Sequence, residues 1–336
     1  MSTNKTVKFG LLGAGGIAQA YSEAIKEVDN AQVVAIADAN LEAAEKMAAE
    51  HGAQAFDSWE ALKAANAIDA LIVCTPPSYH PEHCIEFLSN GIHVLCENPL
   101  AISSASAVEM AKAAKAGNVV FTMASKFRFV DDVAVAKEMV DSGKLGEIIL
   151  YENCFTGVVD MSTRWNSNPE LSGGGVLIDN GTHSLDIMRH FLGDLAEIRV
   201  VEGKRIQKLD VEDTVHVFVR SSGGTLGSID LSWSLHKDLA YFISLYGSEG
   251  TVEIGWRGSR VKMKGEKAWT EFGTGYNKIE SFRNQLGNFA GAILNDEPLV
   301  ITPEDGIASV CSVEAAYQAM QASEWQSVDY FDKLKV

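Results

Sequence analysis

The chain has 336 residues, a formal net charge of −17 at pH 7 and 46% hydrophobic residues. This length exceeds the size at which one hydrophobic core usually stops growing, so two domains are expected. The negative charge, without a basic stripe, argues against nucleic acids and anionic membranes as partners, and no apolar run is long enough to cross a bilayer. The composition therefore predicts a globular, acidic, soluble protein, and an enzyme fits it best.

The cysteines are odd in number and lack the Cys-x-x-Cys spacing of zinc and redox sites. Most lie in apolar runs, which favours buried free thiols. They are Cys74, Cys84, Cys96, Cys154 and Cys311. The segment before Val7 shows no small-residue cleavage site of the kind that ends a secretion signal. We therefore expect a protein of the cytoplasm, a reducing compartment.

The first predicted element is a buried strand at Val7–Leu12, followed by a glycine-rich turn and a helix that runs to about Val28. The turn has the pattern Gly-x-Gly-x-x-Ala, in which Gly13 makes the tight turn and Gly15 lets backbone N–H groups approach a pyrophosphate. Ala18 permits close packing of the helix on the strand. The segment predicts a dinucleotide site at the helix N-terminus, formed by Gly13, Ala14, Gly15, Gly16 and Ile17.

A second strand at Gln32–Ala37 ends at Asp38, 20 residues after Ala18. A carboxylate at this position can accept hydrogen bonds from the hydroxyls of the adenosine ribose. Neither of the two following residues is an Arg or Lys that could bind a 2′-phosphate, so the sequence favours NAD over NADP. The alternative is that Asp38 only caps the helix that begins near Leu41.

Short strands and helices continue to alternate up to residue 95, as in a doubly wound parallel sheet. The strands are expected at 53–56, 70–74 and 92–95, and helices at 78–90 and from residue 58. Loops at the carboxyl ends of such strands should line the cofactor cleft. These loops supply Thr75, Pro76, His80, Glu97 and Asn98. The alternative for His80 is an exposed position in the first turn of a helix, and His83 is expected at the surface.

From residue 147 the pattern changes to strands with alternating apolar and polar residues, which is typical of an antiparallel sheet with one covered face. The strands are expected at 148–155, 196–203, 214–220, 226–234, 241–247 and 251–255. Helices near Ser281–Leu294 and Pro303–Ser323 are expected to pack on this sheet. Aromatic residues of the sheet either cover a partner sheet in an oligomer or belong to the core. They are Trp233, Tyr241, Phe242 and Tyr246.

The loop at residues 160–166 carries Arg164 and Trp165. Arg164 could bind a substrate carboxylate or phosphate, and Trp165 could stack on a sugar ring. A surface arginine and a tryptophan that anchors the loop are the alternative.

The segment Gly173–His183 combines a glycine-rich entry with Asp179 and His183 one helical turn apart. The two side chains therefore share a helix face, which points away from the core-facing Leu185. A carboxylate can orient a neighbouring imidazole, and an imidazole can take a proton from a substrate hydroxyl near neutral pH. Gly181 within the helix predicts a close approach to this face. A solvated surface pair is the alternative, and no third ligand accompanies the pair to suggest a metal.

Together these motifs resemble those of the glucose-fructose oxidoreductase, inositol dehydrogenase and rhizopine-catabolism (Gfo/Idh/MocA) oxidoreductase family, over nearly the whole chain. They are the glycine turn with Asp38, Thr75-Pro76-Pro77-x-x-His80, Glu97-x-Pro99, Arg128-Phe129, the Gly173–His183 segment, Glu212-Asp213-Thr214 and Asp305-Gly306. The resemblance implies an N-terminal NAD-binding Rossmann domain, at residues 1–124. It also implies a C-terminal domain with an open, mostly antiparallel sheet and helices at residues 125–336, which binds substrate and forms a homodimer or homotetramer through its sheet.

In that family a Glu-Lys-Pro lysine helps to position or deprotonate the reacting hydroxyl, but this chain has Asn98 in its place. Lys126 stands two residues before Arg128, where relatives usually carry Asn or Gln. We hypothesise that lysine and amide have exchanged places, so that Lys126 returns the ammonium to the site and Asn98 supplies the amide. The alternative is a solvated Lys126 and a neutral change at Asn98.

The resemblance implies an NAD-dependent oxidoreductase that transfers a hydride between nicotinamide and a secondary hydroxyl or ketone carbon of a sugar, cyclitol or sugar derivative. His183 would be the general base, Asp179 would orient it or hold a substrate hydroxyl, and Lys126 would stabilise the developing alkoxide. One alternative is an enzyme that keeps NAD bound and uses transient oxidation for elimination or epimerisation. The other is a sensor that binds NAD and a sugar without turnover.

Overall fold

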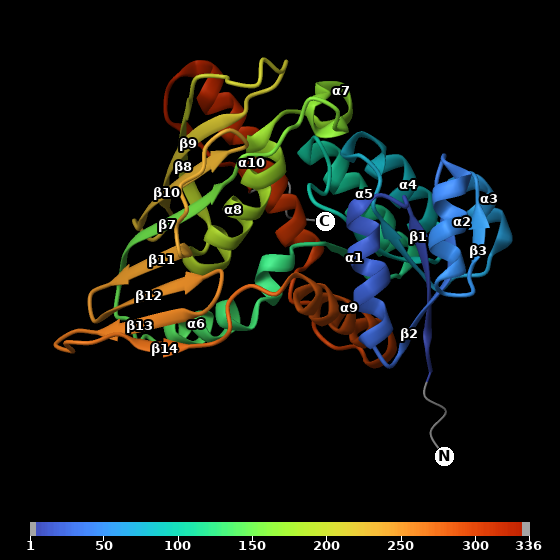
Figure 1. Cartoon of the computed structure of the whole chain (residues 1–336), viewed down its shortest axis with the longest axis horizontal. Coiled ribbons are helices and arrows are strands. Elements are labelled where there is room, and N and C mark those ends of the chain that lie inside the picture. Colours follow the sequence, from blue (N-terminus) through green and yellow to red (C-terminus); the bar gives the residue numbers. More distant parts are fainter. Residues whose placement is uncertain (1–4, 331–336) are drawn as a thin grey trace. The chain divides into compact units, whose positions relative to one another are not determined.

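The computed structural model describes residues 5–330, which form two compact units (Figure 1). Of the described residues, unit 1 contains 5–126 together with Lys278–Ile307. Unit 2 contains Phe127–Asn277 together with residues 308–330. The chain therefore leaves unit 1, builds most of unit 2 and returns, and helix α10 (Pro303–Ala322) contributes residues to both units.

Unit 1 is built on a parallel sheet with the strand order β3-β2-β1-β4-β5-β6. Its strands are β1 (Val7–Leu12), β2 (Ala31–Ala37), β3 (Gln54–Phe56), β4 (Ala70–Val73), β5 (His93–Cys96) and β6 (Phe121–Met123). Its first five helices are α1 (Gly16–Ala24), α2 (Leu41–Ala49), α3 (Trp59–Ala65), α4 (His80–Leu88) and α5 (Ser104–Gly117). The predicted doubly wound sheet is thus confirmed. Its strand order reverses between β1 and β4, the position at which such sheets bind ligands.

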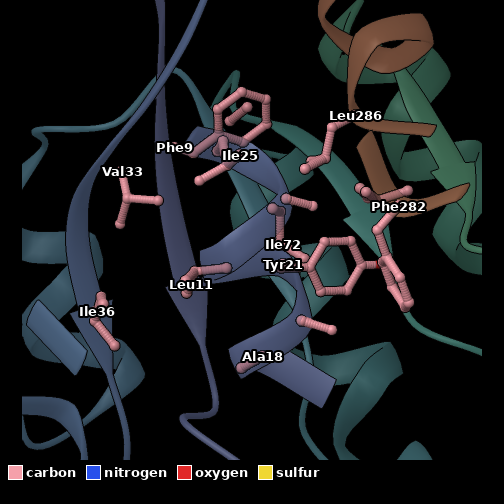
Figure 2. Close-up of a cluster of buried hydrophobic side chains, with 14 of the residues drawn as sticks. Phe9, Leu11, Ala18, Tyr21, Ile25, Val33, Ile36, Ile72, Phe282 and Leu286 are labelled. Atoms are coloured by element: carbon pink, nitrogen blue, oxygen red, sulfur yellow. The ribbon is translucent and has the colours of Figure 1, made fainter. Parts of the chain in front are cut away.

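The core of unit 1 joins segments from both ends of the chain (Figure 2). Phe9 of β1, Tyr21 of α1, and Phe282 and Leu286 of α9 (Lys278–Asn295) are each at most 1% exposed. The rings of Tyr21 and Phe282 meet edge to face, with centroids 4.6 Å apart. Burying a side chain of this size stabilises the fold by about 1.5–3 kcal/mol.

The position of α9 corrects the prediction that a helix near Ser281–Leu294 packs on the second sheet. The buried side chains of α9 contact α1 and β1 of unit 1 instead. Hydrophobic periodicity identifies the buried face of a helix, but it does not identify the sheet which that face covers.

Unit 2 is built on a sheet with the order β14-β13-β12-β11-β7-β10-β9-β8-β15. Its strands are β7 (Ile148–Thr156), β8 (Leu195–Glu202), β9 (Thr214–Ser221), β10 (Leu226–Ser232), β11 (Tyr241–Gly247), β12 (Gly250–Gly255), β13 (Ser259–Met263), β14 (Thr270–Phe272) and β15 (Gln326–Ser327). Neighbouring strands are antiparallel except β7 and β10, which are parallel. The open, mostly antiparallel sheet is confirmed, whereas β13, β14 and β15 were not predicted.

Helix α8 (Val176–Leu192) covers one face of this sheet and contacts β7, β9 and β10 (Figure 1). A buried ion pair fixes its middle, because Arg128 Nε and Nη2 donate to the two carboxylate oxygens of Asp186 at 2.9 and 2.6 Å. Two further helices of unit 2 are α6 (Asp131–Asp141) and α7 (Pro169–Ser172).

The aromatic residues of the sheet divide between core and surface. Trp233 and Phe242 are 3% and 1% exposed, so for these two residues the core alternative is correct and the partner-sheet alternative is wrong. Phe242 packs against Trp256 with ring centroids 4.6 Å apart. Tyr241 and Tyr246 are only partly buried.

Candidate active site

The glycine turn of unit 1 closes tightly against β4. Gly13 has a φ of +97°, and a Cβ at this position would lie 2.9 Å from the Cys74 carbonyl oxygen. By contrast, a Cβ at Gly15 or Gly16 would meet nothing within 4 Å. Open space therefore adjoins the first turn of α1, which no side chain caps within the described part of the chain. The free space and the N–H groups of this turn fit a dinucleotide pyrophosphate.

Asp38 follows β2 at the same edge of the sheet and contacts the glycine turn directly. The Ala14 N–H donates to Asp38 Oδ2 at 2.7 Å, and the Asn40 N–H donates to Oδ1 at 2.7 Å. The alternative that Asp38 only caps the next helix is wrong, because the cap of α2 is Asn40, whose side chain accepts a hydrogen bond from the Ala43 N–H. Asp38 is therefore part of the turn that would hold the dinucleotide.

His80 connects two loops at this edge and is 1% exposed, which excludes the exposed alternative. Its Nε2 lies 2.7 Å from the Thr75 carbonyl oxygen, and its Nδ1 lies 3.0 Å from the Pro99 carbonyl oxygen. Burial lowers the pKa of the ring below its usual value. His80 thus holds the Thr75-Pro76 loop beside the Glu97-Asn98 loop.

His83 was expected at the surface, and this expectation is wrong. The residue is 6% exposed, its Nδ1 lies 3.1 Å from Thr75 Oγ1, and its ring stacks on Tyr79 at 5.9 Å. Burial lowers its pKa to about 4. The loop after β4 bends back over this face of α4, which helical position alone does not show.

Glu97 lies at the centre of a polar cluster of unit 1. Tyr21 OH donates to Glu97 Oε1 at 2.6 Å, and the Asn98 N–H donates to Oε2 at 3.0 Å. Burial raises the pKa of Glu97, while the hydrogen bond from Tyr21 and the charge of Lys126 lower it. Lys126 and the Glu97-Asn98 loop therefore lie within electrostatic reach of one another, as the exchange hypothesis requires.

In unit 2, the glycine-rich entry lets α8 begin against a buried carboxylate. Glu212 Oε1 accepts hydrogen bonds from the N–H groups of Gly175 and Leu177, both at 3.0 Å, and from Tyr317 OH at 2.8 Å. Any side chain at Gly174 or Gly175 would collide with Tyr317 or with the Glu212 backbone. A carboxylate at a helix N-terminus also interacts favourably with the helix dipole. Glu212 thus sets where α8 starts.

Asp179 and His183 lie on the first half of α8, and both are partly exposed. Asn166 Nδ2 donates to Asp179 Oδ1 at 3.3 Å. The His183 ring meets Phe127 edge to face, with centroids 5.3 Å apart. The prediction that Gly181 allows a close approach to the face of Asp179 and His183 is wrong. A Cβ at Gly181 would instead lie 3.1 Å from Leu231 of β10. The close approach is that of the sheet, on the buried side of the helix.

The Arg164-Trp165 loop is tied to the same helix through the next residue, Asn166, which bonds Asp179. Trp165 is 40% exposed and begins a short 3₁₀ turn, Trp165–Ser167. Arg164 is also exposed. An exposed indole whose neighbour in sequence, Asn166, bonds the Asp179 carboxylate is a suitable surface for a polyhydroxylated ring.

The sequence indicated most of these groups and missed the residues that hold them in place. The sequence analysis named Glu212 only as part of a motif, and no local pattern pointed to Asn166, Tyr21 or Tyr317, nor to Gln285, whose Nε2 donates to Tyr21 OH at 2.9 Å. Among residues 5–330, no group of three His, Cys, Asp or Glu side chains could hold a metal ion. In the same residues, no helix has the length and apolarity needed to cross a membrane.

Two family matches cover most of the chain. The family described as "Oxidoreductase family, NAD-binding Rossmann fold" matches residues 7–125, and "GFO/IDH/MocA C-terminal domain" matches residues 133–253.

Similar proteins align along the full length. Inositol 2-dehydrogenase of Rhizobium meliloti (strain 1021) is 26% identical, with 94% of this chain and 97% of that protein covered. Glucose-6-phosphate 3-dehydrogenase of Bacillus subtilis (strain 168) is 31% identical, with 96% and 98% covered. A solved structure, "Levoglucosan dehydrogenase, complex with NADH and levoglucosan", shares the fold with a TM-score of 0.91 at 22% identity, covering 97% of this chain and 100% of that chain. The chain therefore belongs to the GFO/IDH/MocA family of oxidoreductases, and its first part is the NAD-binding Rossmann fold of that family.

Proposed function

We propose that the protein is an NAD-dependent dehydrogenase of a secondary hydroxyl group on a sugar, cyclitol or sugar derivative. The observation that carries this proposal is the pairing of two features in one chain. Unit 1 has the open glycine turn with Asp38, and unit 2 has Asp179 and His183 partly exposed on α8. The inositol and glucose-6-phosphate dehydrogenases that resemble the chain act on such hydroxyl groups.

Asp38 supports NAD as the cofactor in preference to NADP. Its carboxylate lies beside the turn that would receive the pyrophosphate, where it can accept hydrogen bonds from ribose hydroxyls and repels a 2′-phosphate. Gly13, Ala14, Gly15, Gly16 and Ile17 would hold the pyrophosphate. Thr75, Pro76, His80, Glu97 and Asn98 would line the remainder of the cofactor site.

His183 is the proposed general base. It takes the proton of the reacting hydroxyl, and in the reverse direction it returns that proton. The glycine turn and Asp38 would hold NAD, which would supply a hydride acceptor for the carbinol carbon. Asp179, held by Asn166, orients the His183 ring or a neighbouring substrate hydroxyl.

Lys126 supplies the positive charge that stabilises the developing alkoxide, and Asn98 hydrogen-bonds the nicotinamide ribose or the substrate. Glu97 holds the loop and Lys126. Arg164 and Trp165 bind substrate, the first through an anionic group where one is present and the second by stacking on the ring.

Nicotinamide absorbance of the purified protein tests the proposal, first alone and then with NAD and a panel of inositols, glucosides, anhydrosugars and uronic acids. Steady formation of NADH with one compound is the expected result. Transient reduction of bound NAD without net NADH would instead indicate elimination or epimerisation. Absence of any reduction across the panel would favour a sensor.

We further propose a cytoplasmic homodimer or homotetramer that forms through the sheet of unit 2. The sheet face opposite α8 exposes Val201, Phe218 and Leu226 by 42–50% of their surface. Exposed apolar residues on one sheet face favour burial against a second copy. The five cysteines are free thiols, which fits a reducing compartment.

A further inference from the structure

A buried chain of hydrogen bonds in unit 1 connects α9 and α1 with two loops of the proposed site. The Ser125 N–H donates to Gln285 Oε1 at 2.9 Å, and Gln285 Nε2 donates to Tyr21 OH at 2.9 Å. Tyr21 OH in turn donates to Glu97 Oε1 at 2.6 Å. The Asn98 N–H completes the chain by donating to Glu97 Oε2 at 3.0 Å. Tyr21 and Gln285 are 0% and 2% exposed, so water does not compete for the two bonds of Gln285, while the two bonds to Glu97 are part-buried.

The direction of every bond in this chain is fixed. The Ser125 backbone N–H can only donate, so the Gln285 carbonyl faces it and the Gln285 NH₂ group donates to the Tyr21 oxygen. The single Tyr21 hydroxyl proton then points toward Glu97. A side chain at position 285 therefore needs one donor and one acceptor at its end. Neither Glu nor Leu meets both requirements.

The two ends of the chain adjoin the two residues that distinguish this sequence from its family. Ser125 immediately precedes Lys126, and Asn98 immediately follows Glu97. Their loops leave the neighbouring strands β5 and β6, and the Ala124 N–H donates to the Cys96 carbonyl at 2.7 Å. The charge of Lys126 lowers the pKa of Glu97 against the effect of burial, so the ammonium and the carboxylate interact across these loops.

We propose that Tyr21 and Gln285 are positioning residues for catalysis, which hold the backbone at Ser125-Lys126 and at Glu97-Asn98 in one fixed arrangement. The ammonium of Lys126 and the amide of Asn98 then act as a pair that replaces the family lysine. This inference rests on the proposed role of Lys126. Neither Tyr21 nor Gln285 touches substrate in it, and both act through the loops they hold.

The same helix provides a matched control. Phe282 of α9 packs edge to face on the Tyr21 ring (Figure 2). It takes no part in the four hydrogen bonds. Phe282→Leu weakens the packing of α9 on α1 and leaves all four hydrogen bonds in place. A purely structural role for Gln285 would make its variants behave like Phe282→Leu.

The experiment compares Gln285→Leu, Tyr21→Phe and Phe282→Leu in the full-length protein with NADH bound. The first readout is hydrogen exchange at the Ser125 and Asn98 amides. Gln285→Leu should speed exchange at both sites by about tenfold, which is the effect of about 1.4 kcal/mol of lost protection. Phe282→Leu should lower the melting temperature similarly and change neither amide selectively. Unchanged exchange at Asn98 in Gln285→Leu would overturn the proposal, since the chain would then not link the two loops.

The second readout is kcat with the panel compound that NAD oxidises fastest. Gln285→Leu and Tyr21→Phe should lower kcat by about tenfold with NADH affinity changed less than about threefold. In a Lys126→Met background, Gln285→Leu should cause no further loss, because it acts through Lys126. Additive losses would overturn the inference. A wild-type kcat in Lys126→Met alone would instead refute the proposed role of Lys126. If no compound is oxidised, exchange at Asn98 decides the question.

Discussion

At the scale of single residues, the proposed chemistry depends on a pair that lies one helical turn apart. Asp179 and His183 share the partly exposed face of α8, and Asn166 holds the carboxylate. A carboxylate beside an imidazole fixes the orientation of the ring and favours its protonated form during turnover. His190, on the last turn of the same helix, also has a carboxylate four positions before it, but this carboxylate, Asp186, accepts from Arg128 Nε and Nη2 at 2.9 and 2.6 Å.

His183→Ala should lower kcat on the order of 10²-fold or more, because general-base catalysis contributes at least this factor. NAD affinity should be retained, since the glycine turn and Asp38 belong to unit 1. Steady-state kinetics and NADH fluorescence titration measure the two effects separately. His190→Ala, on the last turn of the same helix, is the control and should stay near the wild-type rate. A wild-type rate in His183→Ala would place the base elsewhere.

The hypothesis that Lys126 and Asn98 have exchanged the positions of lysine and amide leads to a second prediction for single residues. Lys126→Met should lower kcat steeply, since the developing alkoxide loses its nearest proposed cation. The double variant Lys126→Asn, Asn98→Lys restores the arrangement usual in the family and should recover part of the rate. Kinetics of the single and double variants measure this recovery. Full activity of Lys126→Met would remove the hypothesis, and no recovery in the double variant would show that the two positions are not equivalent.

At the scale of elements, α8 begins on a buried glutamate and not on a conventional polar cap. Glu212 accepts from Gly175, Leu177 and Tyr317, and Gly174 and Gly175 leave the space for this contact. The glycines that precede Asp179 therefore serve the position of the helix. They allow the Glu212 carboxylate, which lies just before β9, to contact the first turn of α8.

Glu212→Gln should destabilise the protein by about 2 kcal/mol, because three hydrogen bonds to a charged acceptor become bonds to a neutral one. The melting temperature should fall by on the order of 5 °C. Differential scanning calorimetry measures this change. Glu170→Gln, an exposed residue in the first turn of α7, should leave the melting temperature within about 1 °C of wild type. An equal, small effect in both variants would show that Glu212 does not determine the stability of α8.

The helices and strands differ in how well the sequence predicted their positions. Apolar periodicity and turn residues located β1, β2 and β11 to within a residue, because each lies between clear glycine or polar boundaries. The second sheet's short strands β13, β14 and β15 have too few residues for a pattern. Gly181 was assigned to the exposed face, although its neighbour is Leu231 of a strand 50 residues later. Such contacts depend on tertiary packing, which local patterns do not contain.

The residues of the candidate site also fall into two groups, those that a local motif predicted and those that no local pattern predicted. Gly13, Asp38 and His183 were proposed from the sequence because each belongs to a local motif that is typical of a cofactor or acid–base site. Residues that hold them, such as Gln285 and Glu212, were not, because a buried amide or carboxylate has no distinctive local pattern. The placement of α9 in unit 1 could not be predicted from the sequence either, since α9 directly follows a long segment of unit 2 in the chain.

At the scale of the whole molecule, the two sheets suit the two proposed roles, cofactor binding by unit 1 and oligomer formation by unit 2. Helices pack on the largely buried strands of the parallel sheet of unit 1, and sheets of this kind bind ligands at their carboxyl edge. The sheet of unit 2 has α8 on one face, and the opposite face carries exposed side chains of β8, β9 and β10. A self-complementary use of that face would bury it in a closed oligomer.

Phe218→Asp tests this use of the sheet. Phe218 is 42% exposed on β9, so a monomer accommodates the aspartate in water, whereas an interface would have to bury an unpaired carboxylate. Light scattering after gel filtration should show a multiple of 36.3 kDa for the wild type and a shift to the single-chain mass for the variant. Leu41→Asp, on a 40% exposed position of α2, is the matched control and should keep the wild-type mass. A monomeric wild type, or a Phe218→Asp variant with unchanged mass, would refute the sheet as the interface, because an aspartate at its centre cannot be buried without cost.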